Sequence, residues 1–295
     1  MSENRPRVSI GLPVYNGERY LDEAIRSVLD QSYIDFELLI SDNASTDGTE
    51  EICRSAAASD PRVVYLRNDE NLGAAPNYNR LVDLSNGEYF KWIAHDDGCA
   101  PEFLEQCVRV LDNEPEVVIC YSKTILLDEV GDVLDHYSDG LHLRSPDPCE
   151  RLRVFLDTPG WCNPIFGLIR RSVLSRTPRI GSYPRSDRTL LAELTLHGQF
   201  NELPDYLLHR RVHAEISTEV HVAEKDLAVW FDSRNRERKT FPRWKRYSEY
   251  VRMTQRAPIS LSQRAHVLGL VSRSAMSLGK VRGLLSDVVG QGKNR

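Results

Sequence analysis

The hydrophobic residues of this chain form short runs that alternate with longer segments of helical spacing. Runs of four or five mostly apolar residues, closed by polar residues, predict buried strands. In the segment after the first run, Tyr20, Ala24, Ile25 and Val28 recur every three or four positions, which predicts a helix with one buried face. The pattern predicts strands at 8–12, 36–40, 63–66, 89–93 and 117–121, and helices at 20–31, 49–58, 74–84 and 101–113.

This alternation predicts an α/β fold. Strands that alternate with helices build βαβ units, so we expect a Rossmann-like, mostly parallel sheet flanked by helices. Ligands of such sheets bind outside the carboxyl ends of the strands. Polar clusters that follow three predicted strands are therefore expected to converge in space, and they are residues 13–16, 41–43 and 95–97.

After about residue 130 the alternation is less regular. Gly131 and Asp132 predict a hairpin turn. The runs 165–169 and 206–213 predict strands, and 187–197 predicts a helix. From about residue 222 onward we expect a helical C-terminal appendage.

Composition favours an ordinary globular protein. The chain has 295 residues, of which 41% are hydrophobic and 27% charged. No apolar stretch approaches the ~20 residues that span a bilayer, and the N-terminus leads directly into a strand, which predicts no signal peptide. Six cysteines without a C-x-x-C pair predict reduced thiols, so we expect a cytoplasmic protein.

Charge is unevenly distributed along the chain. From Ser233 to Arg295 there are fifteen Lys and Arg against three Asp and Glu, although the whole chain carries −5. Aromatic residues interleave with these basic ones. This pattern favours two interpretations equally: peripheral contact with the inner face of an anionic membrane, or a solvated helical appendage that packs on the acidic body or on a second subunit of an oligomer. The acidic body would repel nucleic acid.

Two adjacent carboxylates, Asp96 and Asp97, follow a predicted strand in "WIAHDDGCAP". Like charges this close repel each other, so the pair needs a positive partner or belongs to a solvated turn that caps the next helix. A Mg²⁺ or Mn²⁺ ion fits the first alternative, because such cations bind one or two carboxylates together with substrate phosphates.

The neighbouring clusters fit a nucleoside diphosphate. Pro13 and Tyr15 are placed to flank a planar base, and Asp42 is placed to accept hydrogen bonds from a base or ribose. The alternatives are a half-buried loop aromatic for Tyr15 and an Asx turn for Asp42. Both G-x-G-x-x-G and the P-loop motif are absent, which argues against a dinucleotide fold and a P-loop.

Four segments of the sequence resemble the conserved segments of a known protein family. "VSIGLPVYNGERYLDEAIRSVLDQSYIDFELLISDNASTDGT", "NLGAAPNYNRL", "GEYFKWIAHDDGCAP" and "FGLIRRSVL" resemble, in this order, the signature of family 2 glycosyltransferases over residues 6–213. The resemblance implies a glycosyltransferase A-type fold, a nucleoside-diphosphate sugar donor, a Mn²⁺ or Mg²⁺ ion and inversion at the anomeric carbon.

The resemblance also implies roles for donor-binding residues. Asp96 matches a position near the ribose or the metal, and Asp97 looks like the direct metal ligand, while His95 stands where a first Asp is often found. Arg211 and His213 resemble a late segment that reaches the diphosphate or the metal; an exposed edge strand is the alternative. The matched donor positions are Pro13, Tyr15, Glu18, Asp42, Asn77 and Asn79.

The acceptor side carries fewer matches. Asp187 looks like the base that activates the acceptor, and an N-cap of its helix is the alternative. Trp161 and Asn163 are weaker candidates for the acceptor pocket, since Trp is more often a core residue.

Together these observations predict an inverting, metal-assisted glycosyltransferase that acts on a hydroxyl of a glycan or lipid-linked acceptor in cell-envelope polysaccharide biosynthesis. The alternatives are a catalytically silent nucleotide-sugar- or glycan-binding module, or a sugar nucleotidyltransferase, for which "GLPVYNGERY" lacks a rich set of glycines and basic residues. We expect a catalytic domain at 1–221, with a nucleotide-binding half at 1–125 and an acceptor half at 126–221, followed by a basic helical region at 222–295.

Overall fold

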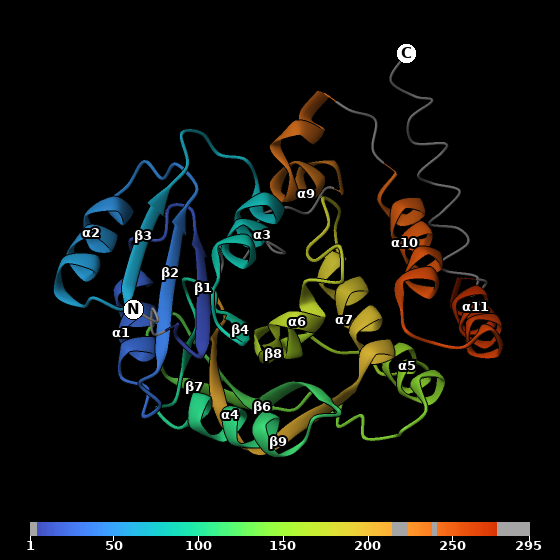
Figure 1. Cartoon of the computed structure of the whole chain (residues 1–295). Coiled ribbons are helices and arrows are strands. Elements are labelled where there is room, and N and C mark those ends of the chain that lie inside the picture. The colour runs from blue at the N-terminus through green and yellow to red at the C-terminus, as the bar shows by residue number, and fades with distance from the viewer. Residues whose placement is uncertain (1–4, 214–223, 238–240, 276–295) are drawn as a thin grey trace.

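The computed structural model describes residues 5–213, 224–237 and 241–275. Within these residues a nine-stranded sheet runs through the molecule, with helices on both of its faces (Figure 1). The elements, in chain order, are β1 (Val8–Val14), α1 (Leu21–Leu29), β2 (Phe36–Asp42), α2 (Thr49–Ser59), β3 (Val63–Arg67), α3 (Ala74–Leu84), β4 (Tyr89–Trp92), β5 (Gly98–Cys99), α4 (Phe103–Asn113), β6 (Val117–Leu127), β7 (Val133–Tyr137), α5 (Pro148–Asp157), η1 (Asn163–Phe166), β8 (Leu168–Arg170), α6 (Arg171–Leu174), α7 (Ser186–His197), β9 (Gln199–Arg211), α9 (Glu224–Phe231), η2 (Ser233–Glu237), α10 (Pro242–Arg256) and α11 (Leu261–Ala275).

The sheet has the strand order β3-β2-β1-β4-β8-β6-β9-β5, and β7 pairs with the second half of β6. Strands β1, β2, β3, β4, β6 and β9 run in one direction, whereas β5, β7 and β8 are antiparallel to their neighbours. The expected mostly parallel α/β sheet is therefore confirmed. Strand β1 has β2 on one side and β4 on the other, and the edge beyond such a switch point is where ligands bind in open α/β sheets.

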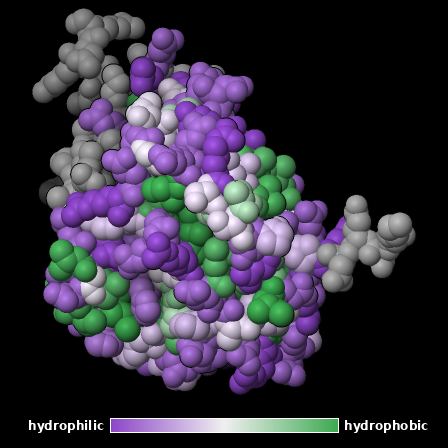
Figure 2. Space-filling view, turned by 90° about the vertical axis from the view of Figure 1, so that its left-hand side faces the viewer, coloured by the Kyte–Doolittle hydropathy of each residue, from purple (hydrophilic) through white to green (hydrophobic). Residues whose placement is uncertain are grey.

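Each face of the sheet has its own hydrophobic core. Helices α1, α2 and α4 cover one face, and α3, α5 and α7 cover the other, together with α10 and α11. All seven residues of β1 are buried, as expected for a parallel strand covered on both faces. Figure 2 shows that the outer surface on the α1 and α2 side is mainly hydrophilic, with hydrophobic side chains in small separate groups.

The structure corrects several predicted elements. The run 165–169 is not one strand: η1 ends at Phe166 and β8 begins at Leu168, because Cys162 has a left-handed backbone and Pro164 opens a short helical turn. Strand β9 begins at Gln199 rather than at 206. Pro204 interrupts it, and the pairing with β6 shifts register there, since proline has no N–H to donate.

Helix α5 was missed by the sequence analysis. Its start carries an N-cap signal that the hydrophobic pattern did not use: the Asp147 side chain accepts a hydrogen bond from Cys149 N at 3.0 Å, and Pro148 is the first helical residue. The predicted hairpin at Gly131 is confirmed by the antiparallel pairing of β6 and β7.

The expected C-terminal helices are present among the described residues. Helix α10 packs on α7, with Tyr250 and Met253 buried in the core. Arg256 of α10 forms an ion pair with Glu193 of α7, at 2.7 Å between Nη2 and Oε2. This packing matches the expectation of an appendage docked on the acidic body. The domain boundary expected at 221/222 lies outside the described residues.

None of the helices in the described part of the chain is long and apolar enough to cross a bilayer. All six cysteines are buried as free thiols, which agrees with the expectation drawn from their spacing.

Candidate active site

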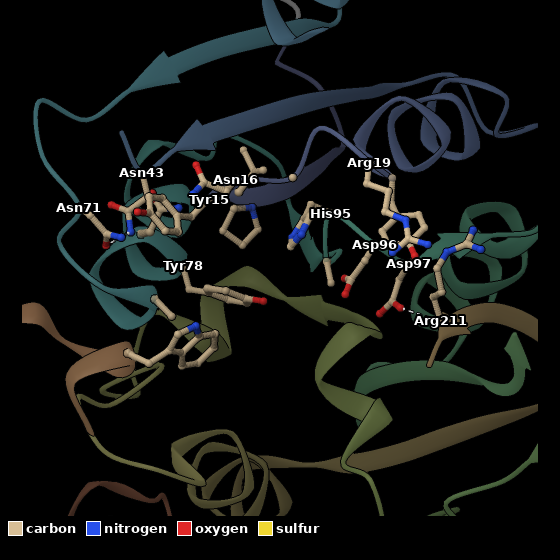
Figure 3. Close-up of a pocket in the computed structure, with 18 of the residues that line it drawn as sticks. Tyr15, Asn16, Arg19, Asn43, Asn71, Tyr78, His95, Asp96, Asp97 and Arg211 are labelled. Atoms are coloured by element: carbon tan, nitrogen blue, oxygen red, sulfur yellow. Dashed lines mark hydrogen bonds between the residues drawn. The ribbon is translucent and has the colours of Figure 1, made fainter. Parts of the chain in front are cut away.

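A cavity of about 990 Å³ opens at the carboxyl edge of the sheet (Figure 3). Its walls come from the ends of β1, β2, β4 and β9, and from α3, η1 and α9. The three polar clusters expected to converge do so, through Tyr15, Asn43 and Asp96. The parallel direction of the strands explains this, because it places their carboxyl ends on one side.

The segment after β1 contributes Pro13 and Tyr15 to the cavity, and Tyr15 is 45% exposed. Backbone contacts fix this segment: Gly17 N donates to Thr49 Oγ1 at 2.9 Å. A Cβ at Gly17 would lie 2.6 Å from the ring of His95, so glycine is what allows His95 to enter the cavity wall. Glu18 does not line the cavity. Its Oε2 accepts a hydrogen bond from the backbone N of the loop before α2, at 2.7 Å.

Asp42 lies behind the cavity wall rather than in it. The side chain is 0% exposed, and its oxygens accept hydrogen bonds from Ser45 N at 2.8 Å, Tyr65 Oη at 2.8 Å and Arg67 Nη1 at 2.5 Å. The bond from Ser45 N is a local turn contact, and an Asx turn was the alternative interpretation of Asp42 from the sequence. Its neighbour Asn43 lines the cavity instead, so a direct contact between Asp42 and a base stays a prediction.

Helix α3 presents Ala74, Asn77 and Tyr78 to the cavity, at the i, i+3 and i+4 positions of one helical face. Asn77 is 3% exposed, and its Nδ2 donates to Ser41 O at 2.8 Å, which ties the helix to β2. Asn79 faces away and donates to Ile180 O at 2.8 Å. Tyr78 was not among the predicted site residues; it reaches the cavity because it lies one helical turn, four positions, after Ala74.

Asp96 and Asp97 lie together at the end of the cavity opposite the asparagines (Figure 3). Asp97 is 7% exposed and its Oδ1 accepts a hydrogen bond from Arg211 N at 3.0 Å. Asp96 Oδ2 lies 2.9 Å from His213 Nε2. Burial and the neighbouring Asp96 carboxylate raise the pKa of Asp97 to about 7. Burial opposes ionisation of Asp96 too, but the hydrogen bond from His213 lowers the pKa of Asp96.

The acidic pair fits a divalent cation shared with a diphosphate. Among the described residues no three His, Cys, Asp or Glu side chains are arranged to enclose a metal by themselves, and His213 faces Asp96 rather than Asp97. A Mg²⁺ site usually needs only one or two carboxylates, with phosphates and water completing it. Burial and the charge of Asp96 raise the pKa of Asp97, so a cation beside this carboxylate would favour its ionised form.

The guanidinium of Arg211 does not point toward the acidic pair. Its Nη2 donates to Glu23 Oε1 at 2.7 Å and the group lies 4.7 Å from the Tyr20 ring centroid. Successive residues of a strand face opposite sides, so Arg210 has the other orientation, and its Nη1 donates to Asn163 Oδ1 at 2.6 Å. Arg210 also lines the cavity, and strand alternation in "RRVH" could have identified it.

Asp187 is the second residue of α7, so it lies in the first turn and is not the N-cap; Arg185 holds that place. Burial raises the pKa of the cavity-lining Tyr78 hydroxyl, and the charges of Asp96, Asp97 and, least, Asp187 add to this shift. Asp187 itself does not line the cavity. Burial raises the pKa of Asp187 itself, although Arg210 and the other arginines beside it oppose this shift.

The two weaker acceptor candidates differ. Trp161 is 44% exposed, and the Arg210 guanidinium lies 4.9 Å from its ring centroid. Asn163 is 1% exposed, and its Nδ2 donates to Thr124 Oγ1 at 3.0 Å while its Oδ1 holds Arg210. Asn163 therefore orients Arg210 and is closed to solvent, whereas Trp161 is open to it.

The curled, mostly parallel sheet, the flanking helices and the acidic pair at the open edge define the glycosyltransferase A-type architecture. The sequence profile described as glycosyl transferase family 2 matches residues 9–176, more than half of the chain. The chain belongs to that family.

Curated relatives agree with this assignment. The chain is similar to an uncharacterized glycosyltransferase of Haemophilus influenzae, at 27% identity over 76% of this chain and 71% of the relative. It is also similar to the abequosyltransferase RfbV of Salmonella typhimurium, at 36% identity over 39% of this chain and 36% of RfbV. A third relative, an uncharacterized glycosyltransferase of Methanocaldococcus jannaschii, matches at 29% identity over 45% of this chain and 47% of its own length. The match thus spans less than half of two of these three relatives.

Solved structures show the same fold. Staphylococcus aureus TarS in complex with UDP-GlcNAc superposes with a TM-score of 0.65, at 14% identity, over 95% of this chain and 79% of that chain. The mannosyltransferase PcManGT of Pyrobaculum calidifontis, in complex with GDP-Man and Mn²⁺, superposes with a TM-score of 0.53, at 17% identity, over 99% of this chain and 88% of that chain.

Proposed function

We propose that this protein transfers a sugar from a nucleoside-diphosphate sugar to a hydroxyl of a glycan or lipid-linked acceptor, with inversion at the anomeric carbon. One observation carries the proposal: Asp96 and Asp97 lie in a cavity at the carboxyl edge of the sheet. Asp187, in the first turn of α7, supplies a separate carboxylate outside the cavity lining. A donor-side pair and a separate carboxylate are what a single displacement requires.

The donor would lie along the cavity. Its base would occupy the end formed by Tyr15, Asn43 and Asn71, where amide groups and an aromatic ring are available (Figure 3). Its diphosphate would then reach Asp96 and Asp97 at the other end. A bound Mn²⁺ or Mg²⁺ would supply positive charge that neutralises the acidic pair and the leaving diphosphate. The Mn²⁺ present in the PcManGT structure supports this assignment.

Asp187 is the proposed general base. A carboxylate whose pKa is raised takes a proton more readily near neutral pH than an ordinary one. The acceptor oxygen attacks the anomeric carbon as its proton passes to Asp187, and the nucleoside diphosphate leaves from the opposite face. This single step inverts the anomeric configuration and needs no nucleophile from the protein.

The names of the relatives support a role in cell-envelope polysaccharides. Besides RfbV, the chain is similar to the putative teichuronic acid biosynthesis glycosyltransferase TuaG of Bacillus subtilis, at 31% identity over 46% of this chain and 54% of TuaG. The name of RfbV is that of an enzyme that transfers a sugar, abequose, and the name of TuaG places its sugar transfer in teichuronic acid biosynthesis.

A donor screen tests the proposal. The full chain is incubated with Mn²⁺ and each of a panel of UDP-, GDP-, dTDP- and CDP-sugars, and release of the nucleoside diphosphate is followed. We expect slow hydrolysis of one donor class and, with the matching nucleoside diphosphate and Mn²⁺, a higher melting temperature. Binding without turnover of any donor would favour the silent binding module. Pyrophosphate release from a nucleoside triphosphate and a sugar phosphate would favour the nucleotidyltransferase.

A further inference from the structure

An exposed tryptophan lies beside a residue of the cavity wall. Trp161 is 44% exposed and lies between α5 and η1. Its ring centroid is 5.7 Å from that of Tyr137 on β7, and the Arg210 guanidinium lies 4.9 Å from it. Arg210 lines the cavity, so the indole, which is not itself part of the cavity lining, lies next to a residue that is. We call Trp161, Tyr137 and Arg210 the aromatic shelf.

The backbone that carries the shelf is held in a defined and strained conformation. Trp161 N donates to Tyr137 Oη at 3.2 Å, and Cys162 N donates to Oδ1 of the buried Asp139 at 3.1 Å. Cys162 has φ +63°, a left-handed value that is costly for a non-glycine residue. A Cβ at Gly160 would lie 2.8 Å from Asp139 Oδ1. Strain of this kind is kept where surrounding contacts fix it, and it is common at functional sites.

The shelf is joined to the helix that carries the proposed base. Arg188 Nη2 of α7 donates to Phe155 O at 3.1 Å and to Thr158 O at 3.0 Å. These two acceptors lie at the end of α5, just before Trp161. Arg188 Nη1 also lies 4.0 Å from Cys162 Sγ. Arg188 directly follows Asp187 and Cys162 directly follows Trp161, so this contact brings the two segments side by side.

Arg210 supplies polar contacts beside the indole. Its Nη1 donates to Asn163 Oδ1 at 2.6 Å and is 3.4 Å from Trp161 O. Its Nε and Nη2 have no hydrogen-bond partner within the described parts of the chain. The shelf thus combines an indole that is 44% exposed with guanidinium donors that have no hydrogen-bond partner among the described residues.

We propose that the aromatic shelf is the acceptor subsite and that it binds a pyranose ring, whose hydroxyl is the one that accepts the transferred sugar. This inference rests on the proposed function. A pyranose has a face of C–H groups that packs on an aromatic ring, and hydroxyls that accept charge-assisted hydrogen bonds from arginine. An acceptor that presented only a hydrocarbon chain would leave Arg210 unused.

Saturation-transfer NMR on the full chain tests the shelf. The probes are the methyl pyranosides of glucose, galactose and mannose, with sorbitol as the acyclic control. We expect saturation of ring protons of at least one pyranoside by the wild type. The signal should fall at least about fivefold in Trp161→Ala and about twofold in Trp161→Phe, which keeps an aromatic face. Trp244→Ala is the matched control, because Trp244 is 50% exposed on α10 and lies outside the cavity lining.

The opposite results are equally clear. Equal saturation in the wild type and in folded Trp161→Ala would overturn the proposal, as would absence of signal for every pyranoside. A wild-type dimer that Trp161→Ala dissociates, seen by sedimentation, would make the shelf an interface between copies instead. If Trp161→Ala loses its circular dichroism, Trp161→Phe decides. Failure of the proposed function has a separate signature, since no nucleoside diphosphate with Mn²⁺ would then raise the melting temperature.

Discussion

His213 Nε2 lies 2.9 Å from Asp96 Oδ2, although 117 residues separate the two along the chain. Asp96 follows β4, and His213 follows β9 at the far side of β8 and β6. The contact forms because β4 and β9 run in the same direction and end at the same edge of the sheet. The contact between His213 and Asp96 thus depends on the assembly of strands β4, β8, β6 and β9 into one sheet.

Replacing Asp97 should separate stability from ligand binding. Asp97→Asn keeps an oxygen for Arg211 N and removes a buried charge beside Asp96, so we expect the ligand-free protein to be as stable or up to about 2 kcal/mol more stable. The rise in melting temperature caused by Mn²⁺ and the preferred nucleoside diphosphate should disappear. Asp135→Asn, an exposed change on β7, is the control and should behave as the wild type. A preserved ligand shift in Asp97→Asn would contradict the cation site.

Asp187→Asn should slow transfer by about a hundredfold to ten-thousandfold, the usual contribution of a general base. Nucleotide binding should remain, because Asp187 does not line the cavity. The raised pKa of Asp187 gives the sign of the pH dependence: the base works only when ionised, so the rate should fall as pH drops through a pKa above the ordinary carboxyl value. The variant should lack this acidic limb in kcat/KM. If the acidic limb of the kcat/KM profile is unchanged in Asp187→Asn, a group other than Asp187 causes it. Asp157→Asn, at the exposed end of α5, is the control.

The ion pair between Arg256 of α10 and Glu193 of α7 should contribute to the free energy of unfolding. Glu193 has a side chain 1% exposed, whereas that of Arg256 is 28% exposed. Arg256→Met would leave a buried carboxylate unpaired and should lower the free energy of unfolding by about 2–3 kcal/mol. The double variant with Glu193→Leu should recover much of the loss. Arg252→Met, on the same helix and 56% exposed, should cost less than about 1 kcal/mol. Urea denaturation gives the free energy of unfolding of the wild type and of the three variants. Equal losses of stability in Arg256→Met and Arg252→Met would contradict a stabilising buried pair.

His197 should make the protein sensitive to mild acid. Burial, with Arg176 and Arg256 nearby, lowers the pKa of His197 to about 4. The unfolded chain, with a pKa near 6.5, then binds the proton first as pH falls. Stability from this group is complete above about pH 6.5 and is lost toward pH 4, by up to about 3 kcal/mol. His197→Leu should flatten the profile over this range, measured by denaturation at each pH.

The matched change for His197 is His136→Leu on β7, where the side chain is exposed. Its profile should follow that of the wild type. The free energy of unfolding of the wild type should fall more steeply between pH 6.5 and pH 4 than that of His197→Leu. Equal slopes would contradict a buried neutral imidazole at His197.

Local patterns predicted most of the first half of the chain well. Helix α3 was expected at 74–84 and lies there, and the ends of β1 and β2 extend only two residues past their expected limits. The apolar runs of these strands are buried on both faces, so their pattern is strong. In the second half, Pro164 and Pro204 break the strands, and the bulge and helical turn that result depend on what packs around them.

The sequence by itself determined the α/β alternation, the polar clusters after the strands and the adjacent acidic pair, because each depends on neighbours a few positions apart. Only the tertiary structure decided that Asp42 is enclosed by Tyr65 and Arg67, and that Arg210 rather than Arg211 directs its guanidinium to the shelf. Exposure and side-chain direction are set by residues distant in sequence, through strand order and register, and no local pattern contains that information.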